Sequence, residues 1–190
     1  MFGQIASFLA DVVASFFVYL LLARFLFQWL RVPLRNVLGE FIIAGTNWMV
    51  LPARRVVPAL LGLDLASFVL AWLVQGLGLW AIYAIAGRHF GSAPEIAAAL
   101  LAGLALIDLV RYALVFLIIA LLVQALLSWF SPYSPMNSVM DAVTRPLLRP
   151  VRRFVPPLGR VDLSPLVLIV LLQILLIPLA HLRTQLGGML

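Results

Sequence analysis

The chain has 190 residues, of which 65% are hydrophobic, and its mean hydropathy is +1.15. A soluble domain of this size cannot bury so much apolar surface, so the composition excludes a soluble globular protein. The chain has no cysteine and only two histidines, which excludes disulfides and cysteine nucleophiles and disfavours a conventional metal centre. The net charge of +6 comes with arginine as the only basic residue type, and in a membrane protein it sets topology and attracts anionic lipid.

Four apolar stretches are long enough to cross a membrane as helices. They cover residues 12–30, 65–87, 112–130 and 163–180, and Arg24 is the one charge within them. The first stretch belongs to a run from Ile5 to Leu30 that is too long for the core of a signal peptide, and no lysine or arginine precedes it, so we expect it to stay in the mature protein. The sequence therefore predicts an all-α, polytopic protein with four transmembrane helices.

The apolar segment that leads into the third span is too long for one crossing. Residues 96–130 would extend about 50 Å as a helix, against a hydrocarbon core of about 30 Å. Ser92 to Glu95 fits a capping box that opens a helix. We therefore expect a helix on the outer surface from Pro94 to about Gly103, followed by a span from about Leu106 to Phe130.

The loop after the first span is repeated after the third. Residues 46–65 and 144–163 both fit T-x5-P-x-R-R-x-V-P-x-L-x3-D-L without a gap, and Trp29 and Trp129 occupy matching positions upstream. An internal repeat fixes the architecture. We predict two repeats, 1–91 and 92–190, each with two spans. An even number of spans makes the repeats parallel, related by a pseudo-two-fold axis along the membrane normal.

The two long loops carry most of the arginines, so they are expected in the cytoplasm, with both termini outside. In the second loop, Asn137 is placed to cap a helix with one charged and one apolar face, which would lie at the headgroups until Pro146 and Pro150 bend or end it. The first loop has a weaker apolar face at residues 37–42. We expect interfacial helices in both loops.

The loop arginines are the main candidates for function. They would dock an acidic protein segment or a lipid headgroup, because arginine grips carboxylate and phosphate with two hydrogen bonds, although any inner loop also collects arginine for topology. Asp64 and Asp162 either favour a helix N-terminus or pair with the arginines of their own loop. The candidate docking residues are Arg54, Arg55, Arg145, Arg149, Arg152 and Arg153.

A few polar residues fall within the apolar segments. Gln75 and Gln173 match in the repeats and are expected near the midplane. They either form a hydrogen bond between helices, for which they would face each other across the pseudo-two-fold axis, or mark an ion path. Asp108 is spaced to pair with Arg111 in one helix, and Arg111 matches Asp11 of the first span, so these two are a second candidate pair. Arg24 is expected to extend toward the cytoplasmic side.

The stretches L-L-S-W-F-S-P at 126–132 and T-R-P-L-L-R-P-V-R-R-F-V-P-P-L-G-R-V-D-L-S-P at 144–165 resemble the YggT repeat, which marks small bacterial integral membrane proteins with plastid relatives. The first repeat keeps the Arg-Arg pair and Asp64 but departs elsewhere, for example with Trp48 in place of Pro146. The resemblance implies a protein of the bacterial inner membrane. It associates bacterial members with osmotic stress and potassium uptake, and plastid members with cytochrome b6 haem assembly and membrane organisation.

No residue pattern in the sequence indicates an enzyme, a bound cofactor or a nucleic-acid site. The leading hypothesis is a non-enzymatic membrane organiser or assembly factor, which docks a membrane or cytoplasmic protein or anionic lipids through its arginine-rich loops. The alternative is a channel or transport component for potassium. Four spans are few for a channel, so that alternative predicts a homo-oligomer.

Overall fold

A computed structural model describes residues 2–57, 64–85, 94–131, 133–154 and 162–189. The described residues form helices and connecting turns, as the sequence predicts. The helices are α1 (Phe2–Trp29), α2 (Val37–Ala53), α3 (Leu65–Ile85), α4 (Pro94–Phe130), α5 (Pro135–Phe154) and α6 (Ser164–Gly187). Four of them, α1, α3, α4 and α6, are long and apolar enough to cross a membrane, which makes the chain a multi-pass membrane protein.

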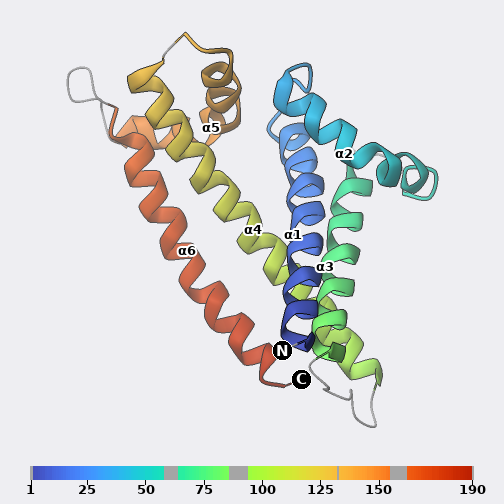
Figure 1. The fold of residues 1–190 in the computed structure, drawn as a ribbon. Helices are drawn as coiled ribbons and strands as arrows, with labels where there is room; N and C mark the ends of the chain where they lie inside the picture. Colours follow the sequence, from blue (N-terminus) through green and yellow to red (C-terminus); the bar gives the residue numbers. More distant parts are fainter. Residues whose placement is uncertain (1, 58–63, 86–93, 132, 155–161, 190) are drawn as a thin grey trace.

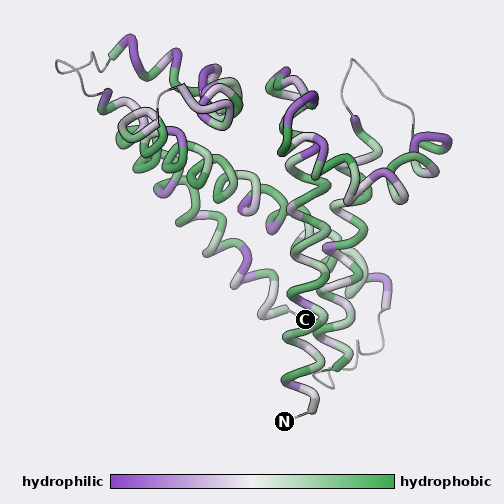
Figure 2. The backbone as a smooth tube through the Cα atoms, turned by 45° about the horizontal axis from the view of Figure 1, so that its top comes forward, coloured by the Kyte–Doolittle hydropathy of each residue, from purple (hydrophilic) through white to green (hydrophobic). Residues whose placement is uncertain are grey.

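Each repeat is a pair of long helices with a shorter helix lying across one end. In the first repeat α1 packs along α3 and α2 crosses their ends, and in the second repeat α4, α6 and α5 take the same places (Figure 1). Both termini lie at one end of the molecule, which we call the terminal end. Helices α2 and α5 lie at the opposite end, which we call the arginine-rich end. Hydrophilic residues concentrate in α5 and next to the ends of α2, whereas α2 itself and the long helices are mostly hydrophobic (Figure 2).

The repeats contact each other mainly through α4, which packs against α3 and α1. The two helix pairs lie close together at the terminal end and diverge toward α2 and α5 (Figure 1). Small residues permit the closest approach within a repeat. A Cβ added to Gly78 of α3 would lie 2.9 Å from the Cβ of Ala14 of α1, so the two backbones are almost in contact.

The division expected in the segment 94–130 does not occur. The structure has one continuous helix of 37 residues, α4, with no proline after its first residue. Its first turns are not a separate surface helix, because Leu101, Leu104 and Ala105 are buried against Leu79 of α3. The helix also crosses the molecule obliquely, and tilt absorbs length that an upright helix could not fit into the bilayer (Figure 1). The capping box expected at Ser92 lies outside the described residues.

Helix α5 is amphipathic as predicted, but its start and its prolines differ from expectation. It begins at Pro135, and Ser134 accepts the Asn137 backbone N–H (3.1 Å), so the N-terminal acceptor is Ser134 and not Asn137. The helix continues through Pro146 and Pro150. Both prolines are on its exposed side, where water or headgroups can satisfy the carbonyls that they leave free.

A left-handed residue turns the chain from α1 toward α2. Arg31 has φ 57°, the Val32 N–H bonds to the Phe27 carbonyl (2.7 Å), and the Arg31 N–H bonds to the Gln28 carbonyl (3.1 Å). These two bonds form a Schellman motif, in which the left-handed position is most often glycine. The motif places Val32 and Phe27 in the same hydrophobic core.

Candidate functional site

The arginine-rich end of the first repeat holds a buried ion-pair network around Asp64, which we call the Asp64 clamp. Asp64 directly precedes α3 and its side chain is 1% exposed. Arg54, at the end of α2, donates from Nη2 to Asp64 Oδ2 (2.7 Å), and Ser67 in the first turn of α3 donates to the same oxygen (2.8 Å). The clamp ties the end of α2 to the start of α3.

Arg24 completes the Asp64 clamp from α1. Its Nε lies 3.2 Å from Asp64 Oδ2, and its Nη1 donates to Thr46 Oγ1 (2.8 Å) and to Asn47 Oδ1 (2.9 Å). Arg24 is expected to extend toward the cytoplasmic side, and its side chain does extend toward the arginine-rich end, but it is 5% exposed and bonds to protein oxygens there. Sequence reasoning did not find this contact, although Thr46 belongs to the repeat motif.

The second repeat has a shorter version of this network, the Asp162 clamp. Arg152 of α5 donates from Nε to Asp162 Oδ2 (2.9 Å), and the Ser164 N–H that opens α6 donates to Asp162 Oδ1 (2.9 Å). The Asp162 side chain is 32% exposed, so this pair reaches the surface. Both aspartates therefore lie against an arginine of their own loop, the alternative that the sequence offered beside a simple helix-terminus role.

Electrostatics keeps both aspartates charged. Burial raises the pKa of Asp64, but the hydrogen bonds from Arg54 and Ser67 and the charges of Arg54 and Arg24 outweigh it and hold the pKa below its ordinary value. The pKa of Asp162 is also lowered, because hydrogen bonds from Ser164 and Arg152 outweigh the effect of burial. The pKa of the Arg54 guanidinium is raised by its hydrogen bond to Asp64. The clamps are thus ion pairs across the neutral range.

In each Arg-Arg pair, one arginine takes part in a clamp and the other does not. Arg54 and Arg152, the first of each pair, hold the aspartates. Arg55 and Arg153, the second of each pair, are exposed and form no ion pair with any residue the structure describes. On the charged face of α5, Arg145 contacts Asp141, whereas Arg149 is exposed and makes no described ion pair. The unengaged docking candidates are Arg55, Arg149 and Arg153.

The terminal end holds a second buried carboxylate, Asp108 of α4. Gln75 of α3 donates to its Oδ2 (3.0 Å), and Arg183 of α6 donates to its Oδ1 (2.7 Å). Arg111, one turn further along α4, lies 3.3 Å from Oδ1, as its spacing predicts. We call these four residues the Asp108 cluster; it joins three helices, and Arg183 is its member that sequence reasoning missed.

Two other expected contacts do not form. Gln173 does not face Gln75, because Gln75 is buried against Asp108 and Gln173 is exposed on α6. Asp11 is exposed on α1 and forms no ion pair with Arg111 within the described part of the chain. The repeats are therefore not symmetric near the midplane, because α4 covers α3 while the matching side of α6 has no such neighbour.

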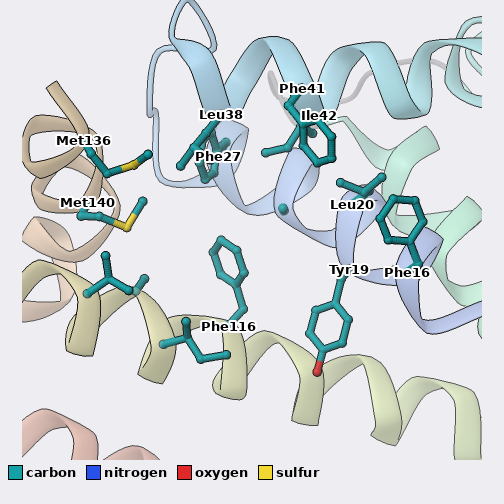
Figure 3. A pocket seen from close by; sticks show the side chains of 14 residues that line it. Phe16, Tyr19, Leu20, Phe27, Leu38, Phe41, Ile42, Phe116, Met136 and Met140 are labelled. Carbon is teal, nitrogen blue, oxygen red and sulfur yellow. The ribbon is translucent and has the colours of Figure 1, made fainter. Parts of the chain in front are cut away.

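Between the diverging repeats, toward the arginine-rich end, lies a cavity of about 480 Å³, the inter-repeat cavity. Its walls come from α1, α2, α4 and α5, and Figure 3 shows aromatic, aliphatic and methionine side chains around it, with the Tyr19 hydroxyl as a polar group. A second, smaller hollow lies between the first turns of α2 and α5 and shares Leu38 and Met136 with it. No cluster of metal-ligand residues occurs among the described residues.

The chain matches the family described as CCB3/YggT over residues 3–85 and 103–183, one segment in each repeat. It is 30% identical over 185 residues to the uncharacterized protein YggT of Escherichia coli K12, covering 97% of this chain and 94% of the relative. An uncharacterized protein of Pseudomonas aeruginosa is 31% identical over 166 residues, covering 85% and 81% respectively. An uncharacterized Vibrio alginolyticus protein is 33% identical over 168 residues, covering 88% and 89%. No solved structure matches the chain significantly.

Proposed function

The chain belongs to the CCB3/YggT family, and on this premise we propose that it is a non-enzymatic organiser of the bacterial inner membrane that holds anionic lipids at its cytoplasmic face. Phosphate headgroups bind the unengaged docking candidates Arg55, Arg149 and Arg153, and acyl chains enter the inter-repeat cavity. In a second version of this proposal, the assembly-factor role, the same arginines dock a protein instead of lipid.

The observation that carries the proposal is that each Arg-Arg pair contains one clamped and one unengaged arginine. Arg54 and Arg152 are used in the clamps, which leaves Arg55 and Arg153 exposed at equivalent places beside them. Charge bias for topology explains arginine in these loops but does not require a clamped arginine followed by an unengaged one. Each clamp fixes the backbone that carries its unengaged neighbour, and an ordered guanidinium binds phosphate at lower entropic cost.

The inter-repeat cavity supports lipid as the ligand. It lies beside the halves of α1 and α4 nearest the arginine-rich end, and its walls are almost entirely carbon. Its volume of about 480 Å³ is within the range of about 300–1,000 Å³ typical of small-molecule pockets. Inside a bilayer, water is disfavoured in such a space and hydrocarbon chains are available on every side. The hollow between α2 and α5 adjoins the cavity, with which it shares Leu38 and Met136.

The same cavity weighs against the channel alternative. An ion route through the centre would need polar groups along its length. The Asp108 cluster supplies them at the terminal end only, and the space between the repeats beyond it is apolar in the residues described. The organiser proposal therefore has the better physical support.

Lipid enrichment around the purified, full-length protein tests the proposal. The protein is reconstituted in nanodiscs of phosphatidylcholine with a minor share of labelled phosphatidylglycerol, and energy transfer to a dye on the protein reports the local anionic lipid. We expect the Arg55→Gln, Arg153→Gln variant to lose this enrichment. The matched control, Arg31→Gln with Arg35→Gln, removes the same charge from the same end and should keep it.

Equal enrichment in the two variants would mean that only overall charge matters and would overturn the proposal. Arg152 must stay intact in this test, because its substitution breaks the Asp162 clamp and confounds docking with folding. Crosslinking in native membranes distinguishes the protein-docking form. A single protein captured by the wild type and lost with Arg55→Gln, Arg153→Gln would replace lipid as the ligand.

A further inference from the structure

The two repeats place matching polar residues at their arginine-rich ends, a set that we call the polar frame. In each repeat it consists of the motif threonine, the first arginine of the Arg-Arg pair, the aspartate before the second long helix, and residue 24 or 124 of the first long helix. Thr46 and Thr144 match in the repeat motif, and both are fully buried. Each donates its hydroxyl to the backbone carbonyl four residues earlier, Ile42 O at 2.6 Å and Met140 O at 2.9 Å. A threonine that has given its proton to a carbonyl can only accept at its remaining lone pair. Both repeats therefore build the same buried acceptor beside the first long helix.

One position in this frame differs between the repeats. Arg24 of α1 and Gln124 of α4 match at the same offset as Trp29 and Trp129, and both are buried, at 4% and 7% exposure. In the first repeat the Arg24 guanidinium fills the frame, because it donates to Thr46 Oγ1 at 2.8 Å and reaches Asp64 at 3.2 Å. A permanent cation thus occupies the centre of the first frame.

In the second repeat the acceptors remain and the cation is missing. Gln124 Oε1 is buried and has no hydrogen-bond partner among the described residues. Thr144 Oγ1 is satisfied by its bond to Met140 O, but a lone pair of this oxygen stays available, because no described residue donates to it. The unpartnered Gln124 oxygen costs stability when nothing fills its place. An unpartnered buried oxygen at the position where the other repeat holds a cation indicates a ligand rather than a packing defect.

We propose that the second repeat binds a small monovalent cation, such as potassium, sodium or ammonium, where the first repeat holds the Arg24 guanidinium. Gln124 Oε1 and Thr144 Oγ1 are its ligands, and Asp162 has the position in the second repeat that Asp64, the partner of Arg24, has in the first. Charge supports this assignment. Arg24, Arg54 and Asp64 carry one net positive charge, whereas Arg152, Asp162 and the neutral Gln124 carry none, so one monovalent cation makes the two frames equal.

The ligands also select the class of ion. Two neutral oxygens and one carboxylate already paired with Arg152 give a weak negative field. Divalent magnesium and calcium prefer sites built from several carboxylates, and transition metals prefer nitrogen or sulfur. Access is available as well, because the Asp162 side chain is 32% exposed while that of Asp64 is 1% exposed. An ion can therefore enter from the arginine-rich end.

Thermal unfolding of the purified, full-length protein in detergent tests this site. The midpoint is measured against increasing potassium, sodium or ammonium chloride, with choline chloride replacing the salt so that ionic strength stays constant. A ligand that binds only the folded state raises the midpoint in proportion to the logarithm of its excess over Kd. We expect a rise with at least one of the three cations in the wild type, and no rise with choline.

Four variants decide the assignment. Gln124→Leu and Thr144→Val should each abolish the cation-dependent rise, while Gln173→Leu, a glutamine change on the exposed side of α6, should keep it. Gln124→Arg should raise the midpoint in choline and remove the response to cations, because it supplies the second frame with its own guanidinium. A wild-type midpoint that does not respond to any cation would mean that water fills the site, and would overturn the proposal. A response retained in Gln124→Leu would place the ion elsewhere.

Discussion

The Arg24 guanidinium lies 3.2 Å from the Asp64 carboxylate, and both side chains are at most 5% exposed although forty positions separate them in the chain. Removing one partner of a buried pair leaves the other charge without compensation. We expect Arg24→Leu to lower the free energy of unfolding by about 3 kcal/mol, the low end for such pairs, because Arg54 still faces Asp64. Unfolding in a denaturing detergent, followed by circular dichroism, measures the loss.

A matched variant controls for the position of that substitution. Gln124→Leu removes a side chain of similar depth at the equivalent place in α4, and Gln124 makes no ion pair. It should cost much less stability than Arg24→Leu when no small cation is present. Equal losses in the two variants would show that packing, and not the ion pair, stabilises this end of the first repeat.

The matching glutamines provide a second test of the asymmetry between the repeats. Gln75 is buried and donates to Asp108, whereas Gln173 is exposed on α6. We expect Gln75→Leu to destabilise the protein by about 0.6–1.7 kcal/mol, between the mean and the maximum measured for hydrogen bonds between membrane helices. Gln173→Leu should be neutral or stabilising, because it removes a polar group from a surface that faces lipid. Unfolding midpoints of the two variants under identical conditions make the comparison, and a larger loss for Gln173→Leu would contradict the asymmetry.

The clamps should make stability depend on acid. Asp64 and Asp162 have pKa values lowered below the ordinary value of 3.8 in the folded protein, so the unfolded chain binds protons first as the pH falls. Stability is therefore constant well above pH 3.8 and decreases as the pH falls through that value toward the folded pKa values. Unfolding midpoints between pH 7 and pH 3 should show this decline. In Asp64→Asn the decline should be smaller, from a lower starting point, and an unchanged slope would assign it to other groups.

Much of the fold follows from local sequence, and the failures share one cause. Span length and the repeat motif predict the four long helices and the two crossing helices, and they offer the pairing of Asp64 and Asp162 with their own loops as one of two alternatives. The contact between Arg183 and Asp108 joins residues 75 positions apart that share no motif. The unbroken α4 and the exposure of Gln173 likewise depend on which helices pack together, which an internal repeat does not determine.

The left-handed backbone at Arg31 predicts a stabilising substitution. Arg31 has φ 57° and ends α1, in a position where a side chain costs about 1 kcal/mol and glycine does not. Arg31 is exposed and makes no ion pair with a described residue, so Arg31→Gly removes strain without removing a contact. We expect a net gain of up to about 0.5 kcal/mol in the free energy of unfolding, because the greater chain entropy that glycine loses on folding offsets about 0.5–1 kcal/mol of the relieved strain. Arg35→Gly, at a nearby exposed position without this strain, should be neutral or destabilising.

The absence of cysteine makes the orientation of the protein directly measurable. A single cysteine introduced at Ser138 lies on the exposed side of α5, and one at Gln185 is exposed near the end of α6. The arginine bias predicts that α5 is cytoplasmic, so a membrane-impermeant maleimide added to intact cells or spheroplasts should label Gln185→Cys and leave Ser138→Cys unmodified. Permeabilising the cells should expose both positions equally. The reverse pattern would place the clamps and the inter-repeat cavity on the outer side. It would contradict the lipid-docking proposal, which depends on the negative surface potential of the cytoplasmic leaflet.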